Sequence, residues 1–114
     1  MEKVPFDPQR WQVAAENDRW KVAYLGYCER FGSLTGMERH LQTDEVFVLL
    51  RGEATLYVED ERFPMEQGTV YNVKKGEWHH IVVSHDAAVL VVENSDTAPH
   101  NTEKKECVIC SQAI

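Results

Sequence analysis

The sequence predicts an all-β fold, either a sandwich or a barrel of short strands. About seven short segments rich in β-branched and aromatic residues follow one another at close, regular spacing, and turn-forming residues separate them. No segment shows a convincing helical stripe, in which apolar residues recur every three to four positions. These two observations favour a fold built from strands alone.

Each expected strand has its own signal. Residues 20–27 are rich in aromatic and aliphatic side chains, and residues 31–36 have the composition of a turn. A β-branched and aromatic run at 45–51 ends at Gly52, so residues 54–59 are expected to be its hairpin partner. Further short strands are expected at 63–65, 69–73, 78–83 and 87–93, with turns at 67–68, 75–76 and 84–86.

The two ends of the chain differ from this central part. Residues 1–19 carry two early prolines, mixed charge and weak periodicity, which predict an N-terminal arm. Within the arm, Trp11 and Val13 could anchor it to the body as an edge strand. From residue 94 onward the chain turns polar, so residues 94–114 are expected to be a C-terminal tail. Residues 20–93 then form one domain.

Composition excludes several function classes. The 114 residues carry a net charge of −7, whereas a nucleic-acid-binding surface needs clustered lysine and arginine. No apolar run approaches the length of a membrane span, and the first residues do not resemble a signal peptide. Three cysteines, an odd number, fit a reducing compartment, so a cytoplasmic location is expected.

Four residues in the central part carry metal-ligand chemistry. Glu38 and His40 are two positions apart, so on a strand they project to the same face. Glu45 begins the next strand after a short turn, and His79 arrives from a separate hairpin. Two imidazoles and a carboxylate that converge in this way suit Fe(II), and also Mn, Ni or Zn. The sequence therefore predicts a site for a divalent transition metal.

Two sequence blocks carry a family resemblance. The first, from Gly36 to Gly52, reads G-M-E-R-H-L-Q-T-D-E-V-F-V-L-L-R-G, and the second, from Gly68 to His79, reads G-T-V-Y-N-V-K-K-G-E-W-H. They resemble the paired motifs of the cupin family over residues 36–93. The resemblance implies a double-stranded β-helix, also called a jelly roll, with a metal inside it. Relatives include isomerases, dioxygenases, lyases and decarboxylases, so the fold does not choose the reaction.

The match is incomplete at three positions. Glu38 stands where the family's first motif has a histidine, Lys74 where its second motif has a proline, and Val83 where it has an asparagine. Glu38 has three readings: a fourth metal ligand, a general base beside the metal, or a residue turned to solvent. His40 and its partners also have a plainer reading, as a polar cluster that holds no metal.

The other histidines are not expected to be metal ligands. Strand alternation points His80 away from His79, which predicts a surface or interface role. His85 falls in a turn and His100 in the tail.

The cysteines have no clear chemical role in the sequence. Cys107 and Cys110 have the spacing of a redox or half-zinc site, but the chain lacks the helical context of the first and the further ligands of the second. A reduced tail without a function is the favoured interpretation. Cys28 is expected to be a packing residue.

Aromatic residues at strand spacing suggest a ligand pocket. Phe47 is the best candidate, because it shares a face with Glu45. Tyr24, Tyr57, Tyr71 and Trp78 are the other candidates, and plain core packing is the alternative for all of them.

Some strands are apolar on both faces, which predicts a homodimer. In residues 46–50 and 89–92, apolar side chains follow one another without a break, so one apolar face must point away from the core. A second subunit or the N-terminal arm would cover it.

Three function classes remain open. The first is a metal-dependent enzyme acting on a small polar metabolite. The second is a binding or sensor module, with or without metal, favoured by the missing first histidine. The third is a structural dimer without a ligand.

Overall fold

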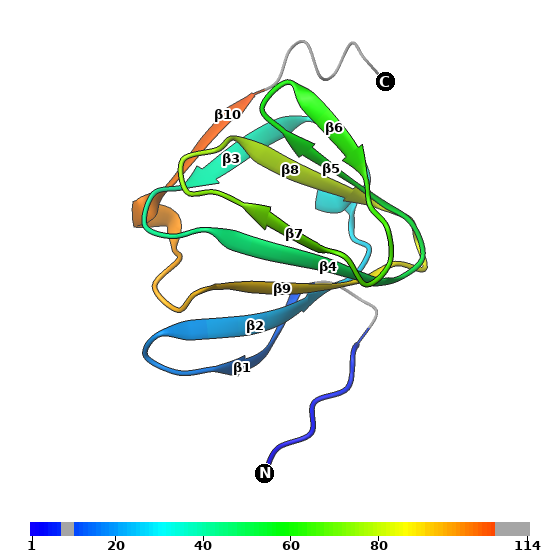
Figure 1. Cartoon of the computed structure of the whole chain (residues 1–114), viewed down its shortest axis with the longest axis vertical. Coiled ribbons are helices and arrows are strands. Elements are labelled where there is room, and N and C mark those ends of the chain that lie inside the picture. Colours follow the sequence, from blue (N-terminus) through cyan, green and yellow to red (C-terminus); the bar gives the residue numbers. More distant parts are fainter. Residues whose placement is uncertain (8–10, 107–114) are drawn as a thin grey trace.

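The computed structural model describes residues 1–7 and 11–106. Within them, ten strands form two five-stranded antiparallel sheets that face each other (Figure 1). Two short 3-10 turns, η1 (Glu29–Phe31) and η2 (Pro99–Asn101), are the only helical elements in these ranges, and neither is long or apolar enough to cross a membrane. The predicted all-β fold is confirmed.

The chain crosses repeatedly between the two sheets. The first sheet has the order β1 (Trp11–Glu16), β2 (Trp20–Leu25), β9 (Ala88–Asn94), β4 (Glu45–Arg51) and β7 (Val70–Val73). The second has the order β10 (Thr102–Glu106), β3 (Gly36–His40), β8 (His79–Val83), β5 (Ala54–Val58) and β6 (Glu61–Pro64). Many strands that follow one another in sequence, such as β3 and β4, thus lie in opposite sheets. The same holds for β4 and β5, so the hairpin predicted between residues 45–51 and 54–59 is wrong: β4 pairs with β7 and β9, and β5 pairs with β6 and β8.

Both predicted ends belong partly to the sheets. Inside the predicted arm, β1 pairs with β2 as an edge strand, with Trp11 opposite Leu25. The predicted tail is wrong for residues 102–106, because β10 pairs with β3 and places Thr102 opposite His40. Its sequence, Thr-Glu-Lys-Lys-Glu, shows no apolar alternation, since a charged edge strand needs little burial and keeps other chains away. Cys107 and Cys110 lie outside the described residues.

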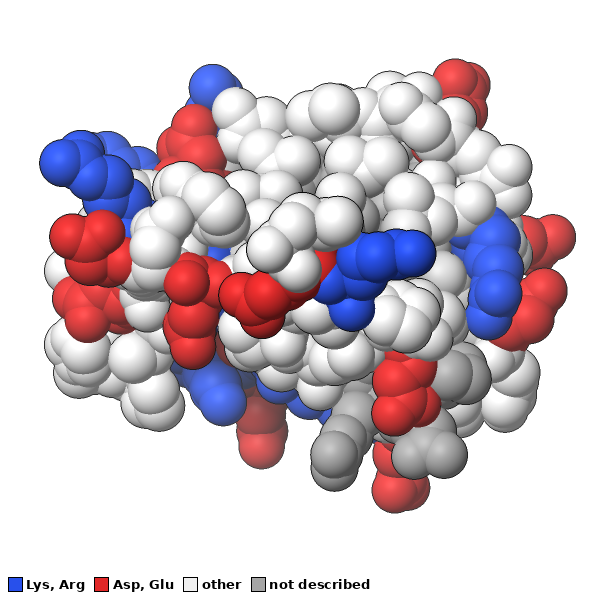
Figure 2. Space-filling view, turned by 90° about the horizontal axis from the view of Figure 1, so that it is seen from below, with Lys and Arg blue, Asp and Glu red and all other residues white. Residues whose placement is uncertain are grey.

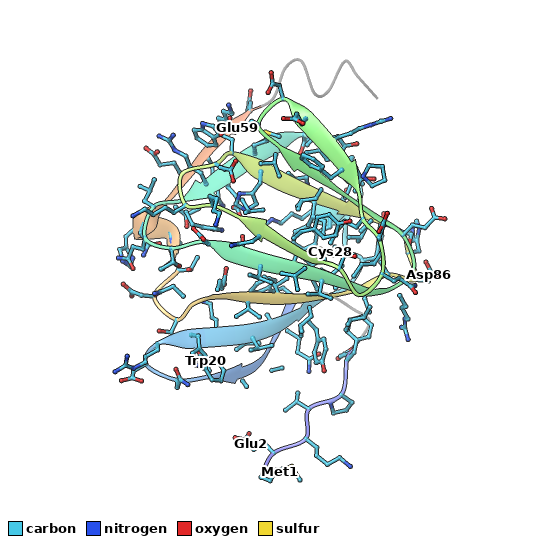
Figure 3. The ribbon with its side chains drawn as sticks, in the orientation of Figure 1. Met1, Glu2, Trp20, Cys28, Glu59 and Asp86 are labelled. Atoms are coloured by element: carbon cyan, nitrogen blue, oxygen red, sulfur yellow. The ribbon has the colours of Figure 1, made fainter. Side chains whose placement is uncertain are left out.

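Alternation along the strands builds the core between the sheets. On β4, Phe47 and Leu49 face inward on the same side as Glu45, and all three are buried. The most deeply buried side chains come from both sheets: Leu25, Leu49, Leu56, Val89 and Val91. Cys28 packs against this core, as expected for a small apolar residue (Figure 3).

Two turn glycines have the same backbone conformation and different surroundings. Gly52 follows β4 with φ of 75°, and Gly68 precedes β7 with φ of 77°. A Cβ at position 52 would lie 2.7 Å from the Cα of Ala87, whereas a Cβ at position 68 would meet nothing within 4 Å. Left-handed backbone favours glycine at both positions, and only Gly52 is also required by close packing.

The outer face of the first sheet is largely apolar. Two rows of paired residues cross it, Val46–Val92–Val22 and Val70–Val48–Leu90–Tyr24. The N-terminal segment covers one end, because the Phe6 ring packs against Tyr24 with centroids 5.6 Å apart. Val70 is 63% exposed at the other end. Figure 2, seen from below, shows a broad area without charged residues, and Figure 3 shows Met1 and Glu2 away from the sheets.

Candidate metal and ligand site

A cavity of about 300 Å³ opens between the two sheets. Imidazole and carboxyl groups from β3, β4, β8 and β9 line one part of its wall, and apolar side chains such as Phe31, Phe47 and Ile81 line another. Arg30, Lys104 and the segment 97–99 contribute further wall residues. Polar groups that converge in an otherwise apolar cavity are typical of a small-molecule site.

Three strands bring the predicted metal ligands together. His40 ends β3, Glu45 begins β4 after the crossing turn, and His79 begins β8. His79 Nε2 lies 2.9 Å from Glu45 Oε1, and His40 Nε2 lies 3.1 Å from the same oxygen. All three residues are less than 10% exposed. Two imidazoles therefore share one buried carboxylate oxygen.

Hydrogen bonds to the outer ring nitrogens fix the orientation of both imidazoles. His79 Nδ1 lies 3.1 Å from the carbonyl oxygen of Glu77, which can only accept, so Nδ1 carries the proton. In a neutral ring, Nε2 would then point a lone pair at Glu45 Oε1. Two lone pairs 2.9 Å apart repel each other, so the space between them requires a positive charge, from a proton or a metal ion.

His40 has an incompletely satisfied nitrogen. Its Nδ1 lies 2.9 Å from the Thr102 hydroxyl, but its buried Nε2 has no hydrogen-bond partner among the described residues. Buried polar atoms are almost always satisfied, so an exception needs an explanation. An imidazole held at one nitrogen, with the other unused and 3.1 Å from a carboxylate oxygen, is the arrangement of a metal-binding histidine with its supporting hydrogen bond.

The metal-free site holds its charge in an ion pair. Burial opposes ionisation of Glu45, but the interactions with His40 and His79 outweigh burial and hold the pKa of this carboxyl well below its usual range. Burial also opposes the charged form of His79, yet the hydrogen bond and the charge of Glu45 raise the pKa of this imidazole. A carboxylate and an imidazolium therefore stabilise each other in the absence of metal.

Glu93 is a site residue that the sequence analysis missed. It is 7% exposed on β9, and its carboxyl group lies within 4.8 Å of the Glu45 carboxylate. Burial, together with the interaction with Glu45 and its charge, raises the pKa of Glu93 to about 9, and the Lys21 ammonium 3.5 Å away only partly opposes this. The available signal was alternation, because Glu93 shares its face with Val89 and Val91.

The donor set fits a divalent transition metal. Two overlapping sets of three residues have ligand atoms within 4.8 Å of one another: Glu38, His40 and His79, and His40, Glu45 and Glu93. Two metal–ligand bonds of about 2.1 Å that meet at a right angle at the ion place their ligand atoms about 3.0 Å apart. The two distances from Glu45 Oε1 to the imidazole nitrogens, 2.9 and 3.1 Å, agree with this spacing.

Glu38 is neither turned to solvent nor free of other partners. Its Oε1 lies 3.7 Å from His40 Nε2, and the residue lines the cavity. Its Oε2 lies 3.1 Å from Arg30 Nη2, so an ion pair holds the other oxygen. This placement contradicts the solvent reading and leaves the ligand and general-base readings open.

The remaining histidines lie outside both donor sets. His80 is half-buried rather than on the surface, because its Nε2 donates to the Ser33 carbonyl at 3.1 Å and its ring stacks on Phe31. It also lines the cavity, which alternation alone did not predict. His85 stacks on Tyr27, and His100 lies beside Asp96 on the surface.

Of the predicted pocket aromatics, only Phe47 lines the cavity. Tyr24 faces the outer side of β2 against Phe6, and Tyr57 faces the outer side of β5, because the inward positions of these strands alternate with them. Tyr71 packs against the core, and its hydroxyl accepts from the Glu66 amide. The fifth, Trp78, lies outside the cavity under the side chains of Arg39 and Lys105.

These features define a two-sheet barrel with a buried histidine–carboxylate cluster. The model of the Cupin domain family matches residues 32–93, more than half of the chain. The chain belongs to the cupin family, and the resemblance seen in its two motifs is confirmed. None of the curated proteins compared with it matches significantly.

Several solved structures share the fold at low identity. A cupin-2 domain protein from Shewanella frigidimarina is 21% identical, with a TM-score of 0.64 over 78% of this chain and 84% of its own. Streptomyces Pac13, described as a nucleoside dehydratase, is 10% identical, with a TM-score of 0.71 over 88% of this chain and 80% of its own. KdgF from Halomonas sp. is 14% identical, with a TM-score of 0.62 over 74% of this chain and 77% of its own.

Proposed function

We propose that this chain binds one divalent transition metal inside the barrel and a small polar metabolite beside it. His40, His79 and Glu45 would hold the ion, with Glu38 as a fourth ligand on the cavity side. The observation that carries the proposal is the placement of two imidazole nitrogens beside one buried carboxylate oxygen, at 2.9 and 3.1 Å. Iron, manganese, nickel and zinc all accept such donors. When bound, the ion would supply Lewis-acid polarisation of a ligand oxygen.

The chain's own residues prepare the site. The Glu77 carbonyl and the Thr102 hydroxyl orient the two imidazoles, and the inner nitrogens of both lie within 3.1 Å of the same Glu45 oxygen. Phe47 packs against the His79 ring with centroids 5.9 Å apart and excludes water from that side. Glu93 lies next to Glu45, and its raised pKa lets this second carboxyl group hold a proton inside the cavity.

In the first version of this proposal, the protein is an enzyme. A cavity that adjoins the ligand cluster gives room for a metabolite next to the reactive groups. One neighbour of the same fold, Pac13, is described as a nucleoside dehydratase. We leave the reaction open among isomerase, lyase and dioxygenase chemistry.

A second candidate function is ligand binding or sensing without turnover. A proton can occupy the place proposed for the metal, because the metal-free cluster forms a stable carboxylate–imidazolium pair. In that case the cavity still binds a metabolite, but no Lewis acid activates it.

We also propose that the protein is a cytoplasmic homodimer. Apolar rows on the outer face of the first sheet support a second copy as the partner, and the odd number of cysteines supports a reducing compartment. The net charge of −7 supports a small molecule rather than a nucleic acid as the ligand.

Elemental analysis tests the metal proposal directly. Protein purified without chelators should contain close to one transition ion per chain, and metal-free protein should bind one equivalent of Mn, Fe(II), Ni or Zn in a calorimetric titration. No binding of any of the four would overturn the metal proposal and favour the sensing function. Turnover of candidate metabolites by the metal-loaded protein would then separate the enzyme from the binding module.

A further inference from the structure

A second, smaller hollow adjoins the metal cavity. It measures about 190 Å³, and four residues line both spaces: Arg30, Glu38, His80 and Lys104. These shared residues form the boundary between the two hollows, so a molecule in one can extend into the other. The boundary carries two permanent cations and one carboxylate, in a chain whose net charge is −7.

The chain fold holds Arg30 at this boundary. The arginine lies in η1, next to Phe31, which is buried in the core, and its guanidinium lies 5.0 Å from the centre of the Phe31 ring. The hydrogen bond from His80 to the Ser33 carbonyl further fixes the position of η1 and the residues that follow it. Arg30 pairs with Glu38 at 3.1 Å, yet its side chain remains 56% exposed, so most of its five N–H donors are available.

Lys104 reaches the same place from the opposite strand. It pairs in register with Glu38, two residues after Thr102, which contacts the inward-facing His40. Because residues two apart share a face, the Lys104 side chain points toward the cavity. Its neighbour Lys105 lines only the second hollow, and its ammonium lies 4.5 Å from the centre of the Trp78 ring. Lys104 is thus the lysine of β10 that lines both hollows.

We propose that Arg30 and Lys104 bind the oxyanion of the metabolite, a carboxylate or a phosphate group, while the rest of the molecule extends toward His40 and His79. The proposal rests on the small-molecule function proposed above. Glu38 pairs with Arg30 in the absence of ligand, and the incoming oxyanion takes its place beside Arg30. Guanidinium groups suit this role because their parallel N–H donors match both carboxylate and phosphate oxygens.

An anion titration of metal-free protein tests the inference without relying on the metal. Malonate and inorganic phosphate are added at low ionic strength, after removal of chelators, and binding is followed by NMR chemical shifts. Arg30→Gln and Lys104→Gln should each weaken binding by about tenfold, the effect of one charge-assisted hydrogen bond. Arg62→Gln removes the same charge from β6, outside both hollows, and should leave the affinity unchanged.

Glu38→Gln gives a result that a purely structural ion pair does not predict. Removing its charge frees Arg30, so the metal-free variant should bind the anion several-fold more tightly than the parent protein. The inference is overturned if neither anion binds saturably at millimolar concentration, or if Arg30→Gln and Lys104→Gln bind as well as Arg62→Gln. Preference for malonate or phosphate identifies the oxyanion. Metal binding without anion binding would overturn this inference alone, and the reverse would overturn only the metal proposal.

Discussion

Replacing His79 with alanine should abolish most metal binding. Its Nε2 lies 2.9 Å from Glu45 Oε1, and the Glu77 carbonyl holds its outer nitrogen. Loss of a group that only orients a ligand lowers metal affinity by about 10–100-fold. Loss of the ligand itself must exceed that range, so we expect His79→Ala to weaken binding by more than about 100-fold, or about 2.7 kcal/mol.

Two further variants make the His79 result interpretable. His80→Ala removes the adjacent imidazole, which hydrogen-bonds to the Ser33 carbonyl and lies outside both donor sets, so metal affinity should change little. Thr102→Val keeps the size of the side chain but removes the hydroxyl 2.9 Å from His40 Nδ1. This variant should weaken binding by about 10–100-fold. The expected order of effect is therefore His79 first, Thr102 second and His80 last.

Competition with a chromophoric chelator measures these affinities, and urea unfolding of the metal-free variants checks that each one folds. Equal losses in His79→Ala and His80→Ala would refute the reasoning, because alternation and the observed contacts separate the two rings. So would parent-like affinity in a folded His79→Ala protein.

Two other predictions concern stability and assembly. Gly68→Ala should lower the free energy of unfolding by about 1–2 kcal/mol through left-handed backbone strain alone. Gly52→Ala should lower it by about 3 kcal/mol or more, because its Cβ also meets the backbone of Ala87 at 2.7 Å. Urea unfolding compares the two variants, and equal losses would contradict the packing argument. Val48→Asp places a charge in the centre of the outer apolar rows and should convert the proposed homodimer to a monomer in light scattering. A parent protein that is already monomeric would remove the basis for this prediction.

Much of the fold was predictable from local patterns. The β-branched run at 45–51 and the residues after Gly52 specify two strands, β4 and β5, although not the hairpin expected between them. Alternation also placed Glu38 and His40 on one face, and Glu45 at the start of the next strand. These are relations between residues close in sequence, so a single sequence contains the information.

What the sequence did not provide is the pairing of distant strands. β10 has no apolar pattern and is held only at the sheet edge, so its partnership with β3 left no local signal. Glu93 ends an apolar strand, where a carboxylate ordinarily faces solvent, and only the neighbouring β2 and β4 make it a site residue. Tyr24 and Tyr57 failed as pocket residues for a related reason, because the inward face of each strand depends on its register with its neighbours.

The pairing of β10 with β3 also sets when the site is completed. The Thr102 hydroxyl that orients His40 lies 62 residues later in the chain. A ribosome that adds about 5–20 residues per second needs roughly 3–12 s to make that stretch. During this interval His40 and Glu45 have been synthesised, but the strand that fixes the His40 ring has not. Selection among cellular metals at the proposed site is therefore expected to follow synthesis of β10 rather than synthesis of the strands that carry His40 and Glu45.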